Sequence, residues 1–339
     1  MKRRISLCAL AIGMWISSGG WWATQSKYVI RGTAQGTTYT ITYYSSVPLL
    51  TKEGADLLLK KMDEVFSLYR ADSWVMRFNA SLHGCKMDAQ MEPVWQKAME
   101  VYRTTEGIGD ISLYALTQKL KGDDSRITGR SLRRLRSVSG MHLLYQKGDS
   151  LLKIRTGVQL DTDGIAQGYT VDRLSEWIAK QGIRSYVVEL GGEVRVLGCK
   201  PDSKEKMRIA IEAPYLPESG TPISSKYLFM SEGAITSSGN YRKYLATGGR
   251  VGSHIIDPRT GHPVRNELIS VSVYAPDALT ADAYDHAVFA MGLDKGLRFV
   301  DAHPSLAAYF IYRDHDGRVR DTASRSFRSL MNETSHCLN

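Results

Sequence analysis

The spacing of hydrophobic residues changes from a helical to a strand pattern between residues 165 and 197, and this change most constrains the fold. Apolar residues recur at the helical period through Ile165–Ile178. Two short β-branched runs follow, Tyr186–Leu190 and Glu193–Leu197, separated by Gly191 and Gly192, which is typical of two strands joined by a turn. A helix followed at once by a hairpin favours the α+β class.

The same mixture of periods runs through the whole chain of 339 residues. No repeat, low-complexity segment or Pro/Gly/Ser-rich linker divides it. We therefore expect residues 23–339 to form a single two-lobed α+β unit with mixed or antiparallel sheets and flanking helices. Further strands are predicted at 28–30, 37–44, 208–211, 227–230, 269–274 and 307–311, and further helices at 52–69, 94–102 and 279–291.

The N-terminus has the layout of a secretory leader. Three cations at 2–4 precede an apolar run at 5–16, which small residues follow. The run is shorter than the ~20 apolar residues of a membrane span, but Trp21 and Trp22 would sit at a membrane interface if the leader stays attached. Residues 1–22 are thus predicted to be a leader or signal anchor. The protein is expected to be exported, either periplasmic or attached to the outer side of the inner membrane.

Composition excludes several classes of protein. A hydrophobic fraction of 43% with 23% charged residues does not fit a disordered chain or a multi-span membrane protein. The net charge of +9 includes a basic stretch at 119–137, but no aromatic residue interleaves its charges. We expect a solvated surface there and no nucleic-acid partner.

The cysteines predict neither a metal ribbon nor a disulfide framework. Cys85, Cys199 and Cys337 follow the leader without paired spacing, and their odd number permits at most one internal bridge. Cys199 stands next to apolar Val196 and Leu197, which favours a small buried thiol.

Two aspartates and two glycines precede a helix in the segment 161–169. We expect this segment to run from a strand end straight into the helix, whose N-terminus attracts phosphate. Asp161 and Asp163 could hold a divalent cation that bridges to the phosphate, while Gly164 and Gly168 give access to the backbone. The alternative is a capping aspartate with glycines required by packing.

A second acidic group lies in the predicted helix 279–291. Asp282, Asp285 and His286 stand at i, i+3 and i+4, so they project from one side of the helix. Two carboxylates and an imidazole there could ligate a hard metal, and Mg²⁺ is expected where substrate phosphates complete the shell. An exposed charge cluster at the end of an amphipathic helix is the alternative.

A turn at 253–261 carries a histidine. Asp-Pro and Thr-Gly pairs mark the turn, and Ile255 and Ile256 fix the adjoining strand in the core. His254 could take or relay a proton near neutral pH. The alternative is a packed, hydrogen-bonded histidine.

Taken in chain order, these motifs resemble the ApbE family of FAD:protein FMN transferases. The most specific are the runs at 161–172 and 254–261, which are specific only in combination. The others stand at 36–41, 69–79, 190–192, 236–241 and 281–285.

The resemblance implies an activity and its partners. Such an enzyme uses Mg²⁺ to split FAD, transfers the FMN phosphoryl group to a threonine hydroxyl of another protein, and releases AMP. The acceptor would be an exported flavoprotein such as an electron-transfer subunit.

The resemblance also assigns roles to residues. His254 would help to deprotonate the acceptor threonine. The metal would be held by the carbonyl of Gly164 and the side chains of Asp282, Asp285 and His286. The FAD site would be lined by Gln35, Tyr69, Asp110, Ile111, Ser112, Asp161, Gln167 and Ile256.

Four positions depart from the family pattern. His286 replaces a metal-binding threonine, Gln167 replaces lysine or glutamate, and Ser112 and Ser237 replace threonines. An imidazole is a softer ligand than a hydroxyl, which could favour Mn²⁺ over Mg²⁺. Two other functions stay open: an FAD pyrophosphatase, in which water replaces the threonine, and a non-catalytic FAD-binding protein.

Overall fold

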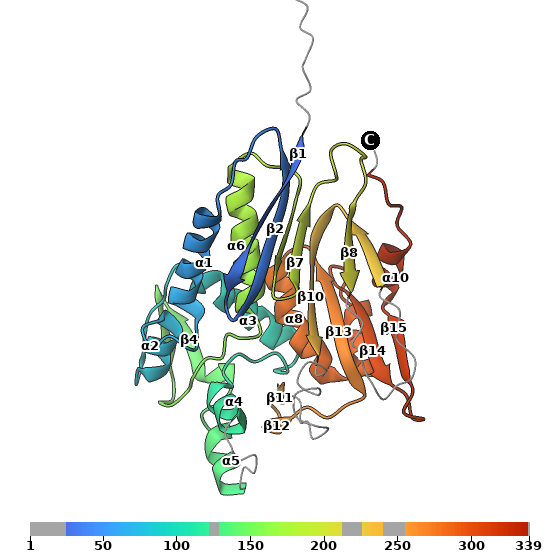
Figure 1. The fold of residues 1–339 in the computed structure, drawn as a ribbon. Coiled ribbons are helices and arrows are strands. Elements are labelled where there is room, and N and C mark those ends of the chain that lie inside the picture. The colour runs from blue at the N-terminus through green and yellow to red at the C-terminus, as the bar shows by residue number, and fades with distance from the viewer. Residues whose placement is uncertain (1–24, 122–128, 212–225, 240–254, 338–339) are drawn as a thin grey trace, which may run out of the picture.

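The computed structural model describes residues 25–121, 129–211, 226–239 and 255–337. Its centre is an eight-stranded antiparallel sheet with the order β1-β2-β6-β7-β10-β13-β14-β15 (Figure 1). The strands are β1 (Ser26–Ala34), β2 (Thr37–Ser45), β6 (Tyr186–Leu190), β7 (Glu193–Leu197), β10 (Glu232–Gly239), β13 (Leu268–Ala275), β14 (Ala307–Arg313) and β15 (Val319–Ala323). The predicted α+β class is confirmed.

The β6–β7 hairpin agrees with the sequence prediction at both ends. Gly191 and Gly192 form its turn with φ of 67° and 114°, a backbone region that side chains disfavour. The register pairs Leu190 with Glu193, so Glu193 is the first residue of β7.

Helices cover one face of the sheet (Figure 1). They are α1 (Lys52–Phe66), α6 (Ala166–Lys180), α8 (Ala278–Met291) and α9 (Leu293–Asp301). Apolar residues at helical spacing in α1 and α6 bury against β2 and β6, through Leu59, Leu174, Ile41 and Val188. Helix α8 packs on β10 and β13 and also contacts α6.

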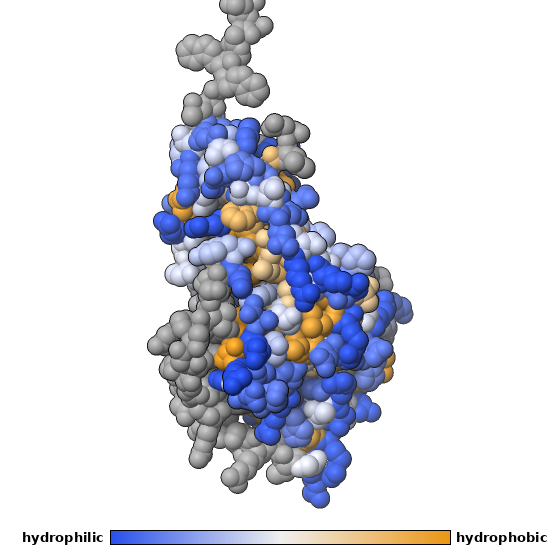
Figure 2. Space-filling view, turned by 90° about the vertical axis from the view of Figure 1, so that its right-hand side faces the viewer, coloured by the Kyte–Doolittle hydropathy of each residue, from blue (hydrophilic) through white to orange (hydrophobic). Residues whose placement is uncertain are grey.

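The opposite face of the sheet is covered by the β8–β9 hairpin and α10. These elements span Met207–Ile211, Lys226–Met230 and Arg325–Met331. Alternate residues of the central strands, such as Val194 and Val196, pack there against Ile209 and Phe327. Figure 2, seen from the side of the last strands, shows a largely hydrophilic surface with hydrophobic patches between the polar side chains.

A second group of elements includes α3 (Met91–Thr104), which packs against α8. This group and α8 belong to one hydrophobic core. Its small sheet has the order β3-β5-β4, formed by Gly84–Lys86, Ser150–Lys153 and Leu144–Lys147. The remaining elements are α2 (Trp74–Ala80), α4 (Tyr114–Lys121), α5 (Gly129–Arg136), the 3₁₀ turn Met141–Leu143, and the short strands β11 (Ile256–Asp257) and β12 (His262–Pro263).

Three expectations about elements need correction. Helix α1 ends at Phe66 rather than Tyr69. No strand leads into Asp161, because the backbone before it makes one isolated parallel bridge, between Leu113 and Gln159. Helix α8 is not amphipathic, since nearly all its side chains are buried between the sheet and neighbouring helices.

The expected thiol at Cys199 is wrong, because Cys199 forms a disulfide with Cys337, with 6.5 Å between the Cα atoms. The C-terminal segment reaches this position by backbone hydrogen bonds from Cys337 N to Lys204 O and from Lys206 N to Ser335 O. These contacts join residues far apart in the chain, so local spacing did not reveal them.

The predicted leader lies outside the described residues. None of the helices in the described ranges has the length and hydrophobicity needed to cross a lipid bilayer.

Candidate active site

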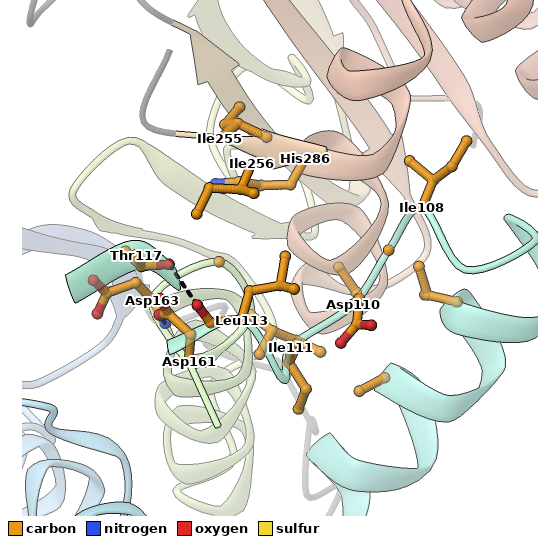
Figure 3. Close-up of a pocket in the computed structure, with 16 residues that line it drawn as sticks. Ile108, Asp110, Ile111, Leu113, Thr117, Asp161, Asp163, Ile255, Ile256 and His286 are labelled. Atoms are coloured by element: carbon orange, nitrogen blue, oxygen red, sulfur yellow. Dashed lines mark hydrogen bonds between the residues drawn. The ribbon is translucent and has the colours of Figure 1, made fainter. Parts of the chain in front are cut away.

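A pocket opens where α8 meets the loops that carry several of the predicted site residues (Figure 3). His286 and Ile256 lie on one side of it, and Asp161 and Leu113 lie across from them. Much of the lining is apolar. The lining residues are Ala98, Val101, Ile108, Gly109, Asp110, Ile111, Leu113, Thr117, Asp161, Asp163, Gly164, Ile165, Ile255, Ile256, Ala283 and His286.

Hydrogen bonds hold the loop around Asp110 next to Asp161. Asp161 N donates to Ile111 O at 2.7 Å. Asp110 Oδ1 accepts from the backbone N and the Oγ of Ser112 at 2.7 and 2.6 Å, and Ser112 Oγ accepts from Gly140 N at 2.5 Å. Burial raises the pKa of Asp110. Asp110 and Ile111 line the pocket, whereas Ser112 is fully buried behind it and shapes the loop.

The segment around Asp161 is held by hydrogen bonds to two distant helices, α2 and α1. The amide of Asn79 donates to Leu160 O at 2.9 Å and accepts from Leu160 N at 2.7 Å. Thr162 Oγ1 donates to Phe66 O at 2.9 Å. These bonds replace the strand that the sequence predicted and fix the direction in which Asp161 faces the pocket.

The acidic residues of α8 form a compact cluster. Ligand atoms of Asp282, Asp285 and His286 lie within 4.8 Å of one another. The exposed alternative is wrong, because Asp282 and Asp285 are only 3% and 1% exposed. The N-terminus of α8 is held by Asp172 of α6, whose carboxylate accepts from Ala278 N and Leu279 N at 3.0 and 2.8 Å.

Charges within the cluster shift its titration. Burial, and then repulsion from Asp285, raise the pKa of Asp282 to about 7, although its Oδ2 accepts from Gly168 N at 2.8 Å. Burial opposes the charged form of His286, but attraction by Asp285 and Asp282 outweighs it and raises its pKa to about 9. His286 Nδ1 lies 2.7 Å from Asp285 Oδ1.

Glu193 is a further buried acidic residue that the sequence motifs did not single out. Its side chain is 9% exposed, and burial, followed by repulsion from Asp282, raises its pKa well above the usual range. A signal was present, since a carboxylate directly follows the Leu190–Gly192 motif at the start of an otherwise apolar strand.

The donor set fits a divalent cation. Carboxylate oxygens are the ligands that hard cations prefer, and an imidazole adds a borderline donor. Gly164 lies directly against this set, because a Cβ there would come within 3.2 Å of the His286 ring. The described residues thus bring together the four predicted metal-site positions.

Other predicted residues lie outside the pocket lining. Gln35 donates through Nε2 to Thr170 Oγ1 at 3.1 Å, and Gln167 lies beside Gly191, where an added Cβ would be 3.3 Å from its Nε2. Tyr69 is 86% exposed in the loop after α1. His254 lies outside the described residues.

A buried acidic cluster beside a largely apolar pocket, on a mixed α/β frame, is an arrangement suited to binding a small ligand together with a cation. The ApbE family matches residues 35–310, and this chain belongs to that family. The resemblance inferred from the motifs is confirmed.

Relatives agree over most of their length. The FAD:protein FMN transferase of Vibrio cholerae is 30% identical, covering 90% of this chain and 92% of that protein. That of Haemophilus influenzae is 28% identical, covering 97% and 99%. Two solved structures are 30% identical with a TM-score of 0.81: the flavin transferase ApbE of V. cholerae, over 90% of this chain and 99% of that one, and the apo flavinyl transferase ApbE of Pseudomonas stutzeri, over 92% and 98%.

Proposed function

We propose that this chain is an FAD:protein FMN transferase that requires Mg²⁺, modifies a threonine hydroxyl and releases AMP. The carrying observation is the buried cluster of Asp282, Asp285 and His286 next to an apolar pocket, in a chain of the ApbE family. In the reaction the threonine Oγ forms a bond to the FMN phosphorus. The bond from that phosphorus to the AMP oxygen breaks, and AMP leaves with the bonding electrons.

Some residues of the chain would bind FAD, and others would hold the cation. Ile111, Ile256 and Ala283 offer apolar contacts for a ring system, while Asp110 and Asp161 offer acceptors at the pocket wall. Asp282, Asp285, His286 and the Gly164 carbonyl would hold the cation, which supplies compensation for charge on the diphosphate. His254 is proposed to accept the proton of the threonine hydroxyl.

The place of action is proposed from the leader and from the disulfide. Disulfides persist in oxidising compartments such as the periplasm, and Cys199 is bonded to Cys337. The protein is therefore proposed to act outside the cytoplasm, free or held at the membrane by its leader. Its acceptor would be an exported flavoprotein such as an electron-transfer subunit.

Incubation of the leader-free protein with FAD, Mg²⁺ and a candidate exported flavoprotein tests the proposal. We expect a covalent product heavier by FMN at one threonine, with one AMP per modified acceptor. An acceptor in which that threonine is replaced by valine serves as control. Free FMN and AMP without labelled acceptor would instead identify a pyrophosphatase, and intact FAD with both Mg²⁺ and Mn²⁺ would identify a binding protein.

A further inference from the structure

We propose that Glu193 is a fourth side chain of the divalent-cation site and determines how tightly the cation binds. This inference rests on the cation dependence in the proposed function. It adds a residue from the sheet to a site that otherwise comes from α8 and from the turn before α6.

The direction of the Glu193 side chain follows from strand alternation. Val194 and Val196 face the β8–β9 hairpin, where they join its hydrophobic cluster. The intervening residues of β7 therefore point to the opposite face, under α6 and α8. Arg195 confirms this, because it pairs with Asp172 of α6.

Two buried oxygens near this position lack hydrogen bonds. Within the described residues, Glu193 Oε2 and Thr236 Oγ1 are buried without a hydrogen-bond partner. The antiparallel register pairs Ile235 with Val194, so the next position places Thr236 beside Glu193 on the same face. A buried carboxylate oxygen without a partner is costly, and a bound cation would remove that cost.

The packing of the elements leads to the same conclusion. Strand β7, which begins at Glu193, packs under α8, the helix that carries Asp282, Asp285 and His286. The short turn at Gly191 also brings Glu193 Oε2 close to α6, since a Cβ on Gly191 would lie 3.1 Å from that oxygen and 3.3 Å from Nε2 of Gln167 in α6.

Cation binding without FAD tests this role directly. Mn²⁺ is titrated into the leader-free wild type and Glu193→Gln, with free Mn²⁺ followed by electron paramagnetic resonance and Mg²⁺ used as competitor. We expect Glu193→Gln to bind Mn²⁺ at least tenfold more weakly. Its metal-free melting temperature should equal or exceed that of the wild type, because the amide keeps the shape and relieves repulsion. Mn²⁺ should then raise its melting temperature less than that of the wild type.

Glu189→Gln is the matched control. Glu189 belongs to the same hairpin, is half-buried, and accepts through Oε1 from Gly192 N at 3.0 Å, a bond that glutamine can keep. The Glu189→Gln variant should bind Mn²⁺ as tightly as the wild type. Should Glu193→Gln fail to fold, Glu193→Asp decides, with Glu189→Asp as its control: weaker Mn²⁺ binding supports the role, and unchanged binding overturns it.

The outcomes separate this inference from the proposed function. If the wild type binds Mn²⁺ and Glu193→Gln binds it equally well, Glu193 has no part in the site, whatever happens to stability. If the wild type itself binds neither Mn²⁺ nor Mg²⁺, both this inference and the cation dependence of the proposed function fail.

Discussion

Asp282 combines a structural hydrogen bond with a charge in the candidate site. In Asp282→Asn the amide oxygen can still accept from Gly168 N, but the negative charge is lost. We expect FMN transfer to fall roughly a hundredfold or more, about 3 kcal/mol of electrostatic stabilisation. Because Asp282 is buried, the melting temperature should change as well, unlike that of a surface variant. Labelling rates over a range of Mg²⁺ concentrations measure the effect.

Asp294→Asn, on the exposed side of α9, is the control for that prediction and should keep the wild-type rate. Full activity of Asp282→Asn at every Mg²⁺ concentration would remove Asp282 from the cation site. The family membership would then support only the fold and flavin binding.

His286 is the clearest departure from the family pattern, and it interacts closely with a neighbouring carboxylate of the cluster. Its imidazole is bonded to Asp285 and its pKa is raised to about 9, so a proton there competes with a cation. His286→Thr supplies a hard hydroxyl and removes this competitor. We expect activity with Mg²⁺ to be kept or raised, at a lower Mg²⁺ requirement.

Metal titrations of transfer with Mg²⁺ and Mn²⁺ check this expectation, and the exposed His262→Thr is the matched control. A higher Mg²⁺ requirement in His286→Thr would instead mean that the imidazole itself contributes to cation binding.

Elements with strong local patterns were predictable, and those defined by distant contacts were not. The bounds of β6 and β7 follow from β-branched runs around two glycines. Strand β10 was missed because Thr236, Ser237 and Ser238 interrupt its hydrophobic pattern, and its place depends on pairing with β7 and β13. Helix α8 was located correctly, but burial on all sides leaves no polar face from which its surroundings could be inferred.

In the candidate site too, residues with a local sequence pattern were predictable and residues placed by distant contacts were not. Asp282, Asp285 and His286 follow from helical spacing within one element. Glu193 joins them only because the sheet brings the start of β7 under α8, which no local spacing encodes. The support of Asp161 by Asn79 is likewise a contact across 81 positions of the chain through Leu160.

A buried lysine of β5, Lys153, is hydrogen-bonded to the C-terminal end of helix α2. Lys153 is 7% exposed and its Nζ donates to Phe78 O and Ser81 O at 2.8 and 2.9 Å. Lys153→Met would remove the Nζ donor from both carbonyls, although Phe78 O keeps its bonds from Ser81 N and Oγ. We therefore expect the free energy of unfolding to fall by about 1–3 kcal/mol. Urea unfolding at pH 7 measures this, with the exposed Lys147→Met of β4 as control.

The pH dependence of that difference has a definite sign. Burial lowers the pKa of Lys153 to about 8 in the folded protein, whereas an unfolded lysine titrates near ~10.4. Between these values the unfolded state binds more protons, so this lysine makes the wild type more stable as pH rises. The stability of the wild type relative to Lys153→Met should therefore increase from pH 7 to pH 10. A difference that stays constant with pH would contradict the lowered pKa.

At the scale of the whole molecule, a disulfide bond links Cys199, just after β7, to Cys337, near the C-terminus. The two residues are 138 positions apart, so the bond restricts most of the second half of the chain when it unfolds. Cross-links of this kind typically contribute about 2–4 kcal/mol, chiefly by lowering the entropy of the unfolded state. The double variant Cys199→Ser/Cys337→Ser should lose stability by that amount.

Urea unfolding with and without dithiothreitol tests the cross-link. The reductant should lower the stability of the leader-free wild type to that of the double variant, and it should not affect the variant itself. Cys85→Ser is the control, because Cys85 is the free cysteine among the described residues, so that variant should still respond to reductant. Neither bonded cysteine lines the pocket at α8, so Mn²⁺ affinity should be unchanged in the folded double variant. Equal unfolding midpoints for wild type and double variant without reductant would show that the bond contributes nothing to stability.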